Sequence, residues 1–527
     1  MNQNKLVQTA GVLMALLLGM SQPAHAVIEG VTGPIFNLKA TSGYISTGDG
    51  NSVYTWGYAD ADGAGVMQYP GPTLIVNQGD TVTINLVNEL PALATSIIFP
   101  GQSNVTASTN VGSQAGLITR EAAPGGTITY SFVATEPGTY MYHGGSQQSL
   151  QLEMGLVGAL IVRPNVAPGV KQAYNHVKTE FNHEYLFLLS EVDPVIHAKV
   201  ERETLPGGLL FGLQELRLEE LRLIPLELQA YDRVIVQGAV LTELVTRPTP
   251  TTVAGRTALN QLIRLATVRL SALLDAHDIL AQRLMGVMAQ IALLEQQIRA
   301  GGVADLSTQN ATLWFINGRN GPDTMLDAQV SWLPNQPYNS VPRMHPGEKL
   351  LMRLINAGRD LHPFHTHGNN TLLLARDGRM LESAPGMGPD LATSNFTIQA
   401  IPGQTYDATF EWTGKGLNFD VYGHKPGDPL EPFENAADHG KPFPEIKPGQ
   451  ALTLPNVLDR TDGEFYSGSP FLGSSEAPRP GQAQANAFGG YFHMWHSHTE
   501  REIVNDDIFP GGMMTMVVIE PHSVTIP

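Results

Sequence analysis

"YPGPTLIVNQGDTVTINLVNEL", residues Tyr69 to Leu90, is the stretch that decides the fold. Within it, Val82, Ile84 and Leu86 alternate with polar residues, which is the pattern of a β-strand with one buried face. The glycines and prolines around this strand are typical of tight turns. The stretch therefore predicts a short-stranded, turn-rich β protein.

A second copy of this design lies in "PRMHPGEKLLMRLINAG", residues 342 to 358. Gly79 and Gly347 each stand nine residues before an asparagine, which is Asn88 in the first copy and Asn356 in the second. The two copies then lead into similar segments, "SIIFPG" and "HPFHTHG". This spacing indicates a duplicated module.

The ends of the two copies match as well. "TYMYHGG" (139–145) parallels "FHMWHSH" (492–498), and each precedes a Gly/Met turn and a final apolar strand. A repeat of well over a hundred residues indicates duplicated domains. Short strands punctuated by glycine and proline favour Greek-key β-sandwiches for both.

Between the modules the pattern becomes that of a long helix. Apolar residues recur there at alternating spacings of four and three, a heptad pattern that only one polar member interrupts: Leu259, Ile263, Ala266, Leu270, Leu273, His277, Leu280, Leu284, Val287, Ile291, Leu294 and Ile298. Residues 209–223 are typical of a second helix. The helical insertion either packs on its own domain or forms a coiled-coil contact between subunits.

Composition limits the classes of function. The 527 residues include 31 basic and 49 acidic side chains, a net charge of −18, which argues against nucleic-acid binding. The first 26 residues hold one charge, Lys5, an apolar core at 12–20 and an A-x-A site at 24–26. They predict a signal peptide, export to the periplasm or beyond the cell, and a mature chain without a membrane span.

Two histidine pairs lie at matched ends of the second module. They are His365 with His367 in "HPFHTHG" and His496 with His498 in "WHSH". Residues i and i+2 of a strand point to the same face, so each pair can present two imidazoles to one point. Neutral imidazole suits copper, zinc, iron or nickel. The alternative is that these are ordinary polar loop histidines.

"PGPTLIVNQGD", "HPFHTHG" and "WHSH" followed by "GGMM" resemble the motifs of the multicopper oxidases, which are built from cupredoxin domains. The resemblance covers roughly residues 27–165 and 310–525 and is greatest to the two-domain branch. It implies copper as the cofactor, oxidoreductase activity, and trimers with the copper cluster at domain interfaces. In the family, four H-x-H pairs hold a three-copper cluster, and a separate copper bound by cysteine takes electrons from the substrate.

Carried over to this chain, the resemblance retains five cluster ligands, which are His143, His365, His367, His496 and His498. The other family positions in the first module fall on Ile98, Pro100 and Gly145, which offer no side-chain ligand. The resemblance thus implies an incomplete ligand set. His493 has no counterpart in the family.

The ligands of the family's substrate-side copper are retained only in part. His362 matches one of its ligands, and Met513 or Met514 matches the weak axial ligand. The family's cysteine falls on Ser497, and a further family histidine falls on Glu502. A serine hydroxyl stays protonated and binds copper poorly, and the chain has no cysteine, so a blue copper centre is excluded.

Acidic residues follow the last histidine pair, at Glu500, Glu502, Asp506 and Asp507. One interpretation is a solvated loop. The other is that a carboxylate joins the histidines, which would shift the preferred metal from copper toward manganese, with zinc as a further alternative. The methionines at 513, 514 and 516 are more typical of a core than of ligands.

The predicted fold class is mainly β, with two cupredoxin-like Greek-key β-sandwich domains and a heptad-patterned helical insertion. The predicted order is a signal peptide (1–26), domain 1 (27–168), the start of domain 2 (169–200), the helical insertion (201–308), and the rest of domain 2 (309–527) with a long loop at about 424–488.

Three functions fit these patterns. The first is an oxidoreductase with an altered histidine-based copper site, acting on a small molecule or a metal ion. The second is a non-catalytic metal-binding protein for storage, delivery or tolerance. The third is a structural or assembly protein on a retired oxidase scaffold. For all three we expect a homo-oligomer, with a trimer as the family's form.

Overall fold

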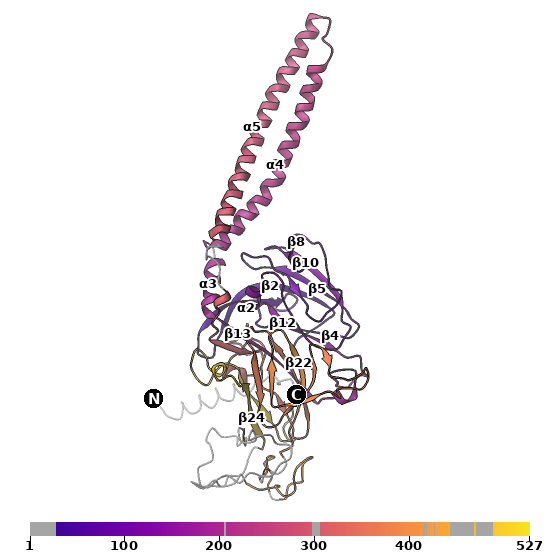
Figure 1. Ribbon diagram of the computed structural model, residues 1–527, viewed down its shortest axis with the longest axis vertical. Coiled ribbons are helices and arrows are strands. Elements are labelled where there is room, and N and C mark those ends of the chain that lie inside the picture. The colour runs from indigo at the N-terminus through magenta and orange to yellow at the C-terminus, as the bar shows by residue number, and fades with distance from the viewer. Residues whose placement is uncertain are drawn as a thin grey trace, which may run out of the picture. The chain divides into compact units, whose positions relative to one another are not determined.

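The computed structural model describes residues 28–204, 207–297, 306–414, 417, 419–425, 427–442, 468–470 and 489–526. The predicted signal peptide lies outside these residues, as does most of the predicted loop at about 424–488. The described part confirms a mainly β chain with a helical insertion (Figure 1).

Two mixed sheets form the first module. One has the order β1 (Val31–Thr32), β4 (Gly71–Asn77), β12 (Val157–Arg163), β11 (Gly138–Gly144) and β6 (Ile97–Ile98). The other has the order β3 (Ser52–Asp60), β2 (Ile35–Ser46), β5 (Thr81–Asn88), β10 (Thr127–Val133) and β7 (Thr106–Ala107). A small hairpin joins β8 (Ser113–Ala115) to β9 (Arg120–Ala122), and a short helix, α2 (Gln148–Glu153), precedes β12. The alternating residues of β5 behave as predicted, since Val82, Ile84 and Leu86 are buried.

Two further sheets form the second module. One has the order β14 (Leu313–Ile316), β13 (His183–Val192), β16 (Lys349–Asn356), β22 (Thr405–Glu411), β18 (Thr371–Arg376) and β19 (Arg379–Met380), with β20 (Thr393–Asn395) also paired to β18. The other has the order β15 (Arg343–Met344), β25 (Met514–Ile519), β24 (Tyr491–Ser497), β17 (His362–Thr366) and β21 (Thr397–Ala400), with β23 (Gly468–Pro470) also paired to β24.

The strand pairing of the first module recurs in the second. Parallel β2 and β5 correspond to parallel β13 and β16, and parallel β4 and β12 correspond to parallel β15 and β25. Antiparallel β6 and β11, with Ile98 opposite His143, correspond to antiparallel β17 and β24, with His365 opposite His496. The register therefore aligns the same residues that the sequence motifs aligned.

The two β modules share one compact unit and pack face to face through apolar side chains. Met141 and Ile161 of the first module lie in one buried cluster with Leu188 and Ile355 of the second. This shared core packs the sheet that carries His143 against the β13–β16 sheet of the second module.

Helices α3 (Pro194–Thr204), α4 (Leu209–Thr246) and α5 (Val253–Gln297) occupy the insertion. α3 begins earlier than the predicted boundary at residue 201. The carboxylate of Asp193 accepts hydrogen bonds from the backbone N–H groups of Val195 and Ile196, and Pro194 takes the first helical position. These are the side-chain cap and the proline that favour a helix start.

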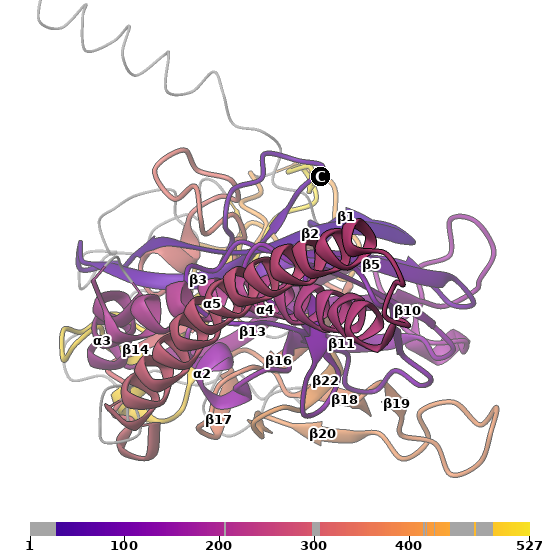
Figure 2. The same cartoon turned by 90° about the horizontal axis from the view of Figure 1, so that it is seen from above.

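α4 and α5 lie side by side as an antiparallel hairpin (Figures 1 and 2). The predicted heptad stripe of α5 faces α4, since Val287 and Ile291 are buried against Leu223. α4 extends to Thr246, well beyond the predicted 209–223 segment and through Pro225, because packing on α5 outweighs the cost of that proline. Ile298, the last predicted member of the stripe, lies outside the described residues.

The described helices include none with the combination of length and apolar character that crossing a bilayer requires.

Candidate metal centre

Two neighbouring strands position the histidine cluster. β17 and β24 are antiparallel, and His365 stands directly opposite His496 in their register. His367 follows the end of β17, two residues beyond His365, and therefore returns to the same side of the strand. The pairing of two distant segments thus brings together histidines that the sequence presents as separate motifs.

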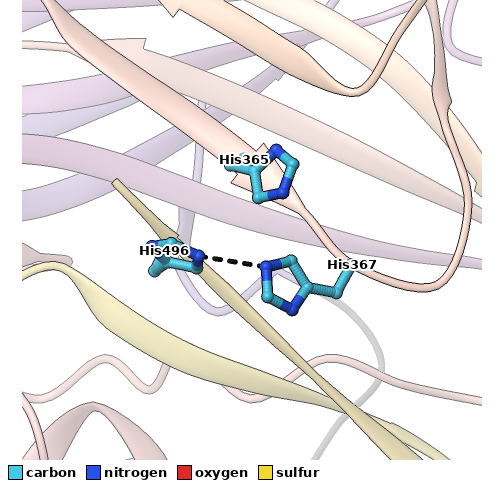
Figure 3. Close-up of side chains that lie close together, drawn as sticks. All are labelled: His365, His367 and His496. Atoms are coloured by element: carbon cyan, nitrogen blue, oxygen red, sulfur yellow. Dashed lines mark hydrogen bonds between the residues drawn. The ribbon is translucent and has the colours of Figure 1, made fainter. Parts of the chain in front are cut away.

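The three rings of His365, His367 and His496 form a compact group (Figure 3). One ligand atom from each lies within 4.8 Å of the others, and Nε2 of His496 lies 3.1 Å from Nε2 of His367. The three residues are 4%, 7% and 8% exposed. The predicted convergence of the two segments is therefore present for these three imidazoles.

Neighbouring groups orient two of these rings. Nδ1 of His496 lies 2.6 Å from the carbonyl oxygen of Ser497, and Nδ1 of His365 lies 2.9 Å from the hydroxyl of Thr397. In His496 the Nδ1–H donates to the carbonyl, which leaves Nε2 with the lone pair that a metal ion needs. Burial lowers the pKa of His496 to about 4, helped by the nearby rings of His365 and His498, so this ring is neutral at pH 7.

His498 stands at the edge of the cluster. Its residue is exposed, and its ring centroid lies 4.8 Å from that of His365 and 5.6 Å from that of His496. The structure therefore supplies three buried imidazoles and a fourth at the solvent side. Assignment of all four as metal ligands stays a prediction.

His143 belongs to the first module, on β11. It is buried, and its Nδ1 lies 3.1 Å from the carbonyl oxygen of Gly144, the same contact with the next residue that His496 makes. Burial also lowers the pKa of His143. Ile98 stands opposite it and Gly145 follows two residues later, so the first module offers one imidazole where the second offers four.

His362 lies in a different environment. It precedes His365 by three residues, so strand alternation turns it into the interior with Phe364. Its Nδ1 lies 2.9 Å from Oε2 of Glu502 and its Nε2 lies 2.8 Å from Oε2 of Glu191. Its role as a metal ligand stays a prediction, and these contacts argue against it because both ring nitrogens are engaged.

The two carboxylates hold His362 as a cation. Burial alone would lower the pKa of His362, but hydrogen bonds and charge from Glu191 and Glu502 raise it to about 9. The hydroxyl of Ser497 donates to the same Glu502 oxygen at 2.5 Å. The positions that the resemblance assigns to a blue copper are therefore joined by hydrogen bonds among Ser497, Glu502 and His362.

The acidic segment divides in two. Glu500, Asp506 and Asp507 are exposed, which fits a solvated loop, whereas Glu502 is buried in the network just described. Met513 is buried in the apolar core of the second module, as expected for a core residue.

His493 points into the same core, on the opposite face of β24 from His496. Both of its ring nitrogens are buried and lack a hydrogen-bond partner within the described part of the chain. Burial, with the nearby ring of His367, lowers the pKa of His493 to about 3, so the ring is neutral. It lies against Tyr491 and Trp412 as a core aromatic ring.

Sequence reasoning missed Glu191. It ends a buried strand and lies 171 residues from His362, outside every motif. An acidic residue close to the apolar run Leu186–Leu189 of a buried strand was the available signal, since such a residue requires a partner.

Residues 55–167 match the family model described as multicopper oxidase. Over part of its length this chain is similar to the multicopper oxidases. The resemblance read from the motifs is thereby confirmed. The matched residues lie in the first module, whereas the three clustered histidines lie in the second.

Curated relatives add detail. An L-ascorbate oxidase of Brassica rapa subsp. pekinensis is 33% identical over 142 residues, covering 26% of this chain and 23% of that protein. The iron transport multicopper oxidase FET3 of Gibberella zeae is 34% identical over 132 residues, covering 25% of this chain and 21% of that protein. The chain therefore spans less than a quarter of the length of these relatives.

Among solved structures, a blue copper oxidase from Nitrosomonas europaea covers 92% of this chain and 85% of its own, with 16% identity and a TM-score of 0.46.

Proposed function

We propose that this multicopper oxidase relative is an exported copper-binding oxidoreductase with a histidine-based copper site and no blue copper centre. The observation that carries the proposal is the convergence of His365, His367 and His496 within 4.8 Å. His498 at the edge and His143 on the first module are the further ligands that the family resemblance assigns.

The donor set fits copper. The clustered groups are imidazoles, which suit copper well, and the His496 ring is neutral with Nε2 as its lone-pair nitrogen. A bound copper ion would supply one-electron redox chemistry at this point. The chain itself orients the rings through Ser497 and Thr397 and limits water access by burying them.

The substrate would be a small molecule or a metal ion that reaches the cluster directly. The hydrogen-bonded network of Ser497, Glu502 and His362 supports this, since it offers no thiolate through which a second copper could take electrons. The net charge of −18 supports a partner other than nucleic acid.

Metal analysis and oxygen uptake test the proposal. Copper-loaded protein should consume oxygen with a phenol, Cu(I) or Mn(II) as the reductant, and it should lack the intense thiolate-to-copper absorption of blue copper proteins. His496→Ala should lose both bound copper and oxygen uptake. His176→Ala, which alters a histidine capping a short turn at 177–179, should keep both. Copper binding without turnover on any of the reductants would contradict oxidase activity.

A non-catalytic metal-binding role is the second candidate, for storage, delivery or tolerance. The closed network at Ser497 favours it, because the usual electron path is absent. Stoichiometric copper that His496→Ala removes, with no activity to lose, is its expected signature. Protein that binds no metal yet stays folded and oligomeric would instead support an assembly role, and a strong rise in melting temperature with metal would contradict that role.

A further inference from the structure

A second group of ligand-type side chains lies in the segment that follows β22, well apart in sequence from the histidine cluster. Asp420, His424, Glu434 and His439 each offer one ligand atom, and these four atoms all lie within 4.8 Å of one another. Sequence reasoning predicted a long loop at about 424–488, which includes His424, Glu434 and His439, and Asp420 lies just before it. The structure turns it back on itself so that its two histidines and two carboxylates converge.

The spacing of the ligand atoms fits a single ion between them. Nδ1 of His424 lies 3.1 Å from Oδ2 of Asp420 and 3.1 Å from Oε1 of Glu434, and Nδ1 of His439 lies 2.8 Å from the same Glu434 oxygen. Four ligands bound at about 2.0–2.1 Å around a tetrahedral zinc ion lie about 3.3 Å from one another. The three distances above are slightly shorter than that figure, and all four ligand atoms lie within 4.8 Å of one another.

Hydrogen bonding alone satisfies these atoms poorly. Nδ1 of His424 carries at most one proton, so it cannot donate a straight hydrogen bond to both Asp420 and Glu434. Oε1 of Glu434 in turn faces two ring nitrogens, which requires both histidines to be protonated at Nδ1. A cation bound by all four atoms removes the conflict at Nδ1 of His424 and needs neither ring to be protonated at Nδ1.

Burial makes the charge of the group costly without such a cation. The side chains of Asp420 and Glu434 are each 3% exposed. Within the described part of the chain, the ion pairs of these two carboxylates are with His424 and His439. Two buried carboxylates beside two imidazoles leave a charge of −2 when the rings are neutral, which a divalent ion cancels.

The backbone fixes the carboxylates in this orientation. The N–H groups of His424 and Gly440 donate to Oδ2 of Asp420 at 3.0 and 2.9 Å, and the N–H of Glu431 donates to Oε2 of Glu434 at 2.9 Å. Oε1 of Glu434 is thereby turned toward the histidines. Such outer contacts commonly orient metal ligands.

The histidines are held as well. The ring of His424 stacks on Tyr422 with centroids 5.5 Å apart, and it lies 4.6 Å from the ring of His439. Gly423 and Gly440, each next to one of the histidines, have φ angles of 77° and 67°. These left-handed turns suit glycine and direct the two imidazoles toward each other.

We propose that Asp420, His424, Glu434 and His439 form a binding site for a divalent first-row transition metal ion, with zinc as the test ion. Two imidazole nitrogens and two carboxylate oxygens are a ligand set that zinc accepts in tetrahedral geometry. The ion ties together a segment that has little regular secondary structure. This site is separate from the three-imidazole cluster and does not depend on the oxidoreductase function.

Zinc titration of the full chain tests the site. A His365→Ala/His496→Ala background silences the other cluster, and metal is removed by a chelator before equilibrium dialysis. The background should bind zinc at the proposed site, and adding Glu434→Gln should remove one equivalent or weaken its binding by about 100-fold or more, beyond the loss typical of outer contacts. Asp428→Asn, an exposed carboxylate change in the same segment, should leave binding unchanged.

His183, His345 and Glu348 form another group of ligand-type side chains elsewhere in the module. Any equivalent of zinc that Glu348→Gln removes from the same background belongs to that group. Circular dichroism of metal-free Glu434→Gln should match the background, which separates a lost ligand from a lost fold. X-ray absorption of the bound zinc should show two imidazoles and two oxygens at the equivalent that Glu434→Gln removes. A background that binds no zinc, or the same zinc binding with and without Glu434→Gln, overturns the proposal and leaves the group as salt bridges only.

Discussion

At Ser497 a hydroxyl donates to Glu502, and Glu502 accepts in turn from His362. If position 502 had kept the family's histidine and no metal were bound, the buried hydroxyl of Ser497 would lack this acceptor. Glu502 supplies an acceptor for the hydroxyl and a countercharge for His362, and Glu191 supplies the second. The two departures from the family pattern, Ser497 and Glu502, are therefore best understood as one change.

His362→Gln tests this network in metal-free protein. The pKa of His362 is raised to about 9 from an ordinary value of 6.5, so its charged form stabilises the fold. That stabilisation is complete below about pH 6.5 and is lost as pH rises through about 9. At pH 6 the variant should lower the free energy of unfolding by about 3–5 kcal/mol, because two buried carboxylates lose their cation.

Urea unfolding at pH 6 and pH 9.5 provides the measurement. The loss caused by His362→Gln should be smaller at the higher pH. Glu500→Gln, which changes an exposed carboxylate close to Glu502 in sequence, is the control and should change stability by less than about 0.5 kcal/mol. Equal effects of His362→Gln at both pH values would show that the ring is not held as a cation.

At this scale, sequence reasoning predicted the cluster but not its surroundings. His365 and His496 each begin an H-x-H pair, and strand geometry places the two residues of such a pair on the same face. Glu191 is far from His362 in the sequence, and no motif links the two residues. The group of Asp420, His424, Glu434 and His439 is assembled by turns rather than by a strand or helix. Contacts of that kind depend on the tertiary path of the chain, which periodicity does not encode.

At the scale of the element, α4 carries two apolar faces. One faces α5 through Leu223. The other is exposed and follows the heptad spacing of three and four, through Leu221, Ile224, Leu228, Tyr231 and Ile235. A stripe of this spacing on a long helix is typical of a coiled-coil contact. The heptad of α5 is used within the chain, so an association between copies would use α4.

Leu228→Glu tests this surface. If copies of the chain associate through α4, the added charge in the apolar stripe should shift the protein toward smaller assemblies, as measured by light scattering after size exclusion. Gln229→Glu adds the same charge at the neighbouring exposed position and should leave the assembly unchanged. Wild-type protein that is monomeric at all concentrations, or a Leu228→Glu variant that assembles as wild type does, contradicts this role of α4.

For the helices, the sequence pattern predicted α5 well and α4 only in part. The regular apolar repeat of α5 predicted its course closely, up to the end of the described helix at Gln297. The part of α4 beyond the predicted 209–223 segment contains Pro225, Gly238 and several β-branched residues, which lower helix propensity. Its helical form comes from packing against α5, and local propensity alone could not reveal it.

At the scale of the whole molecule, a buried charge network joins the two β modules. Arg353 lies 2.9 Å from Glu184 and 3.4 Å from Asp407, and all three residues belong to the second module. From the first module, Arg163 donates to Glu184 at 2.6 Å and Thr139 donates to Asp407 at 2.5 Å. The network and the apolar contacts together couple the folding of the two modules.

Arg353→Met should therefore destabilise the protein as a whole. Removing the arginine leaves Asp407 buried without its cation, a change that costs about 3–5 kcal/mol. Chemical denaturation followed by tryptophan fluorescence measures the effect. Lys349 lies on β16, as Arg353 does, and forms an exposed ion pair with Glu411 of β22. Lys349→Met removes this pair and should cost less than about 1 kcal/mol. Similar losses for the two variants would show that the network contributes little.

The hydrogen bonds among Ser497, Glu502 and His362 also bear on the order of events in biosynthesis. Because protein groups satisfy one another at this position, the second module can complete its interior there before any ion is supplied. If the histidine cluster binds copper as proposed, the ion would then be acquired as a late step on a finished fold. Folding at this position would then not depend on the supply of copper.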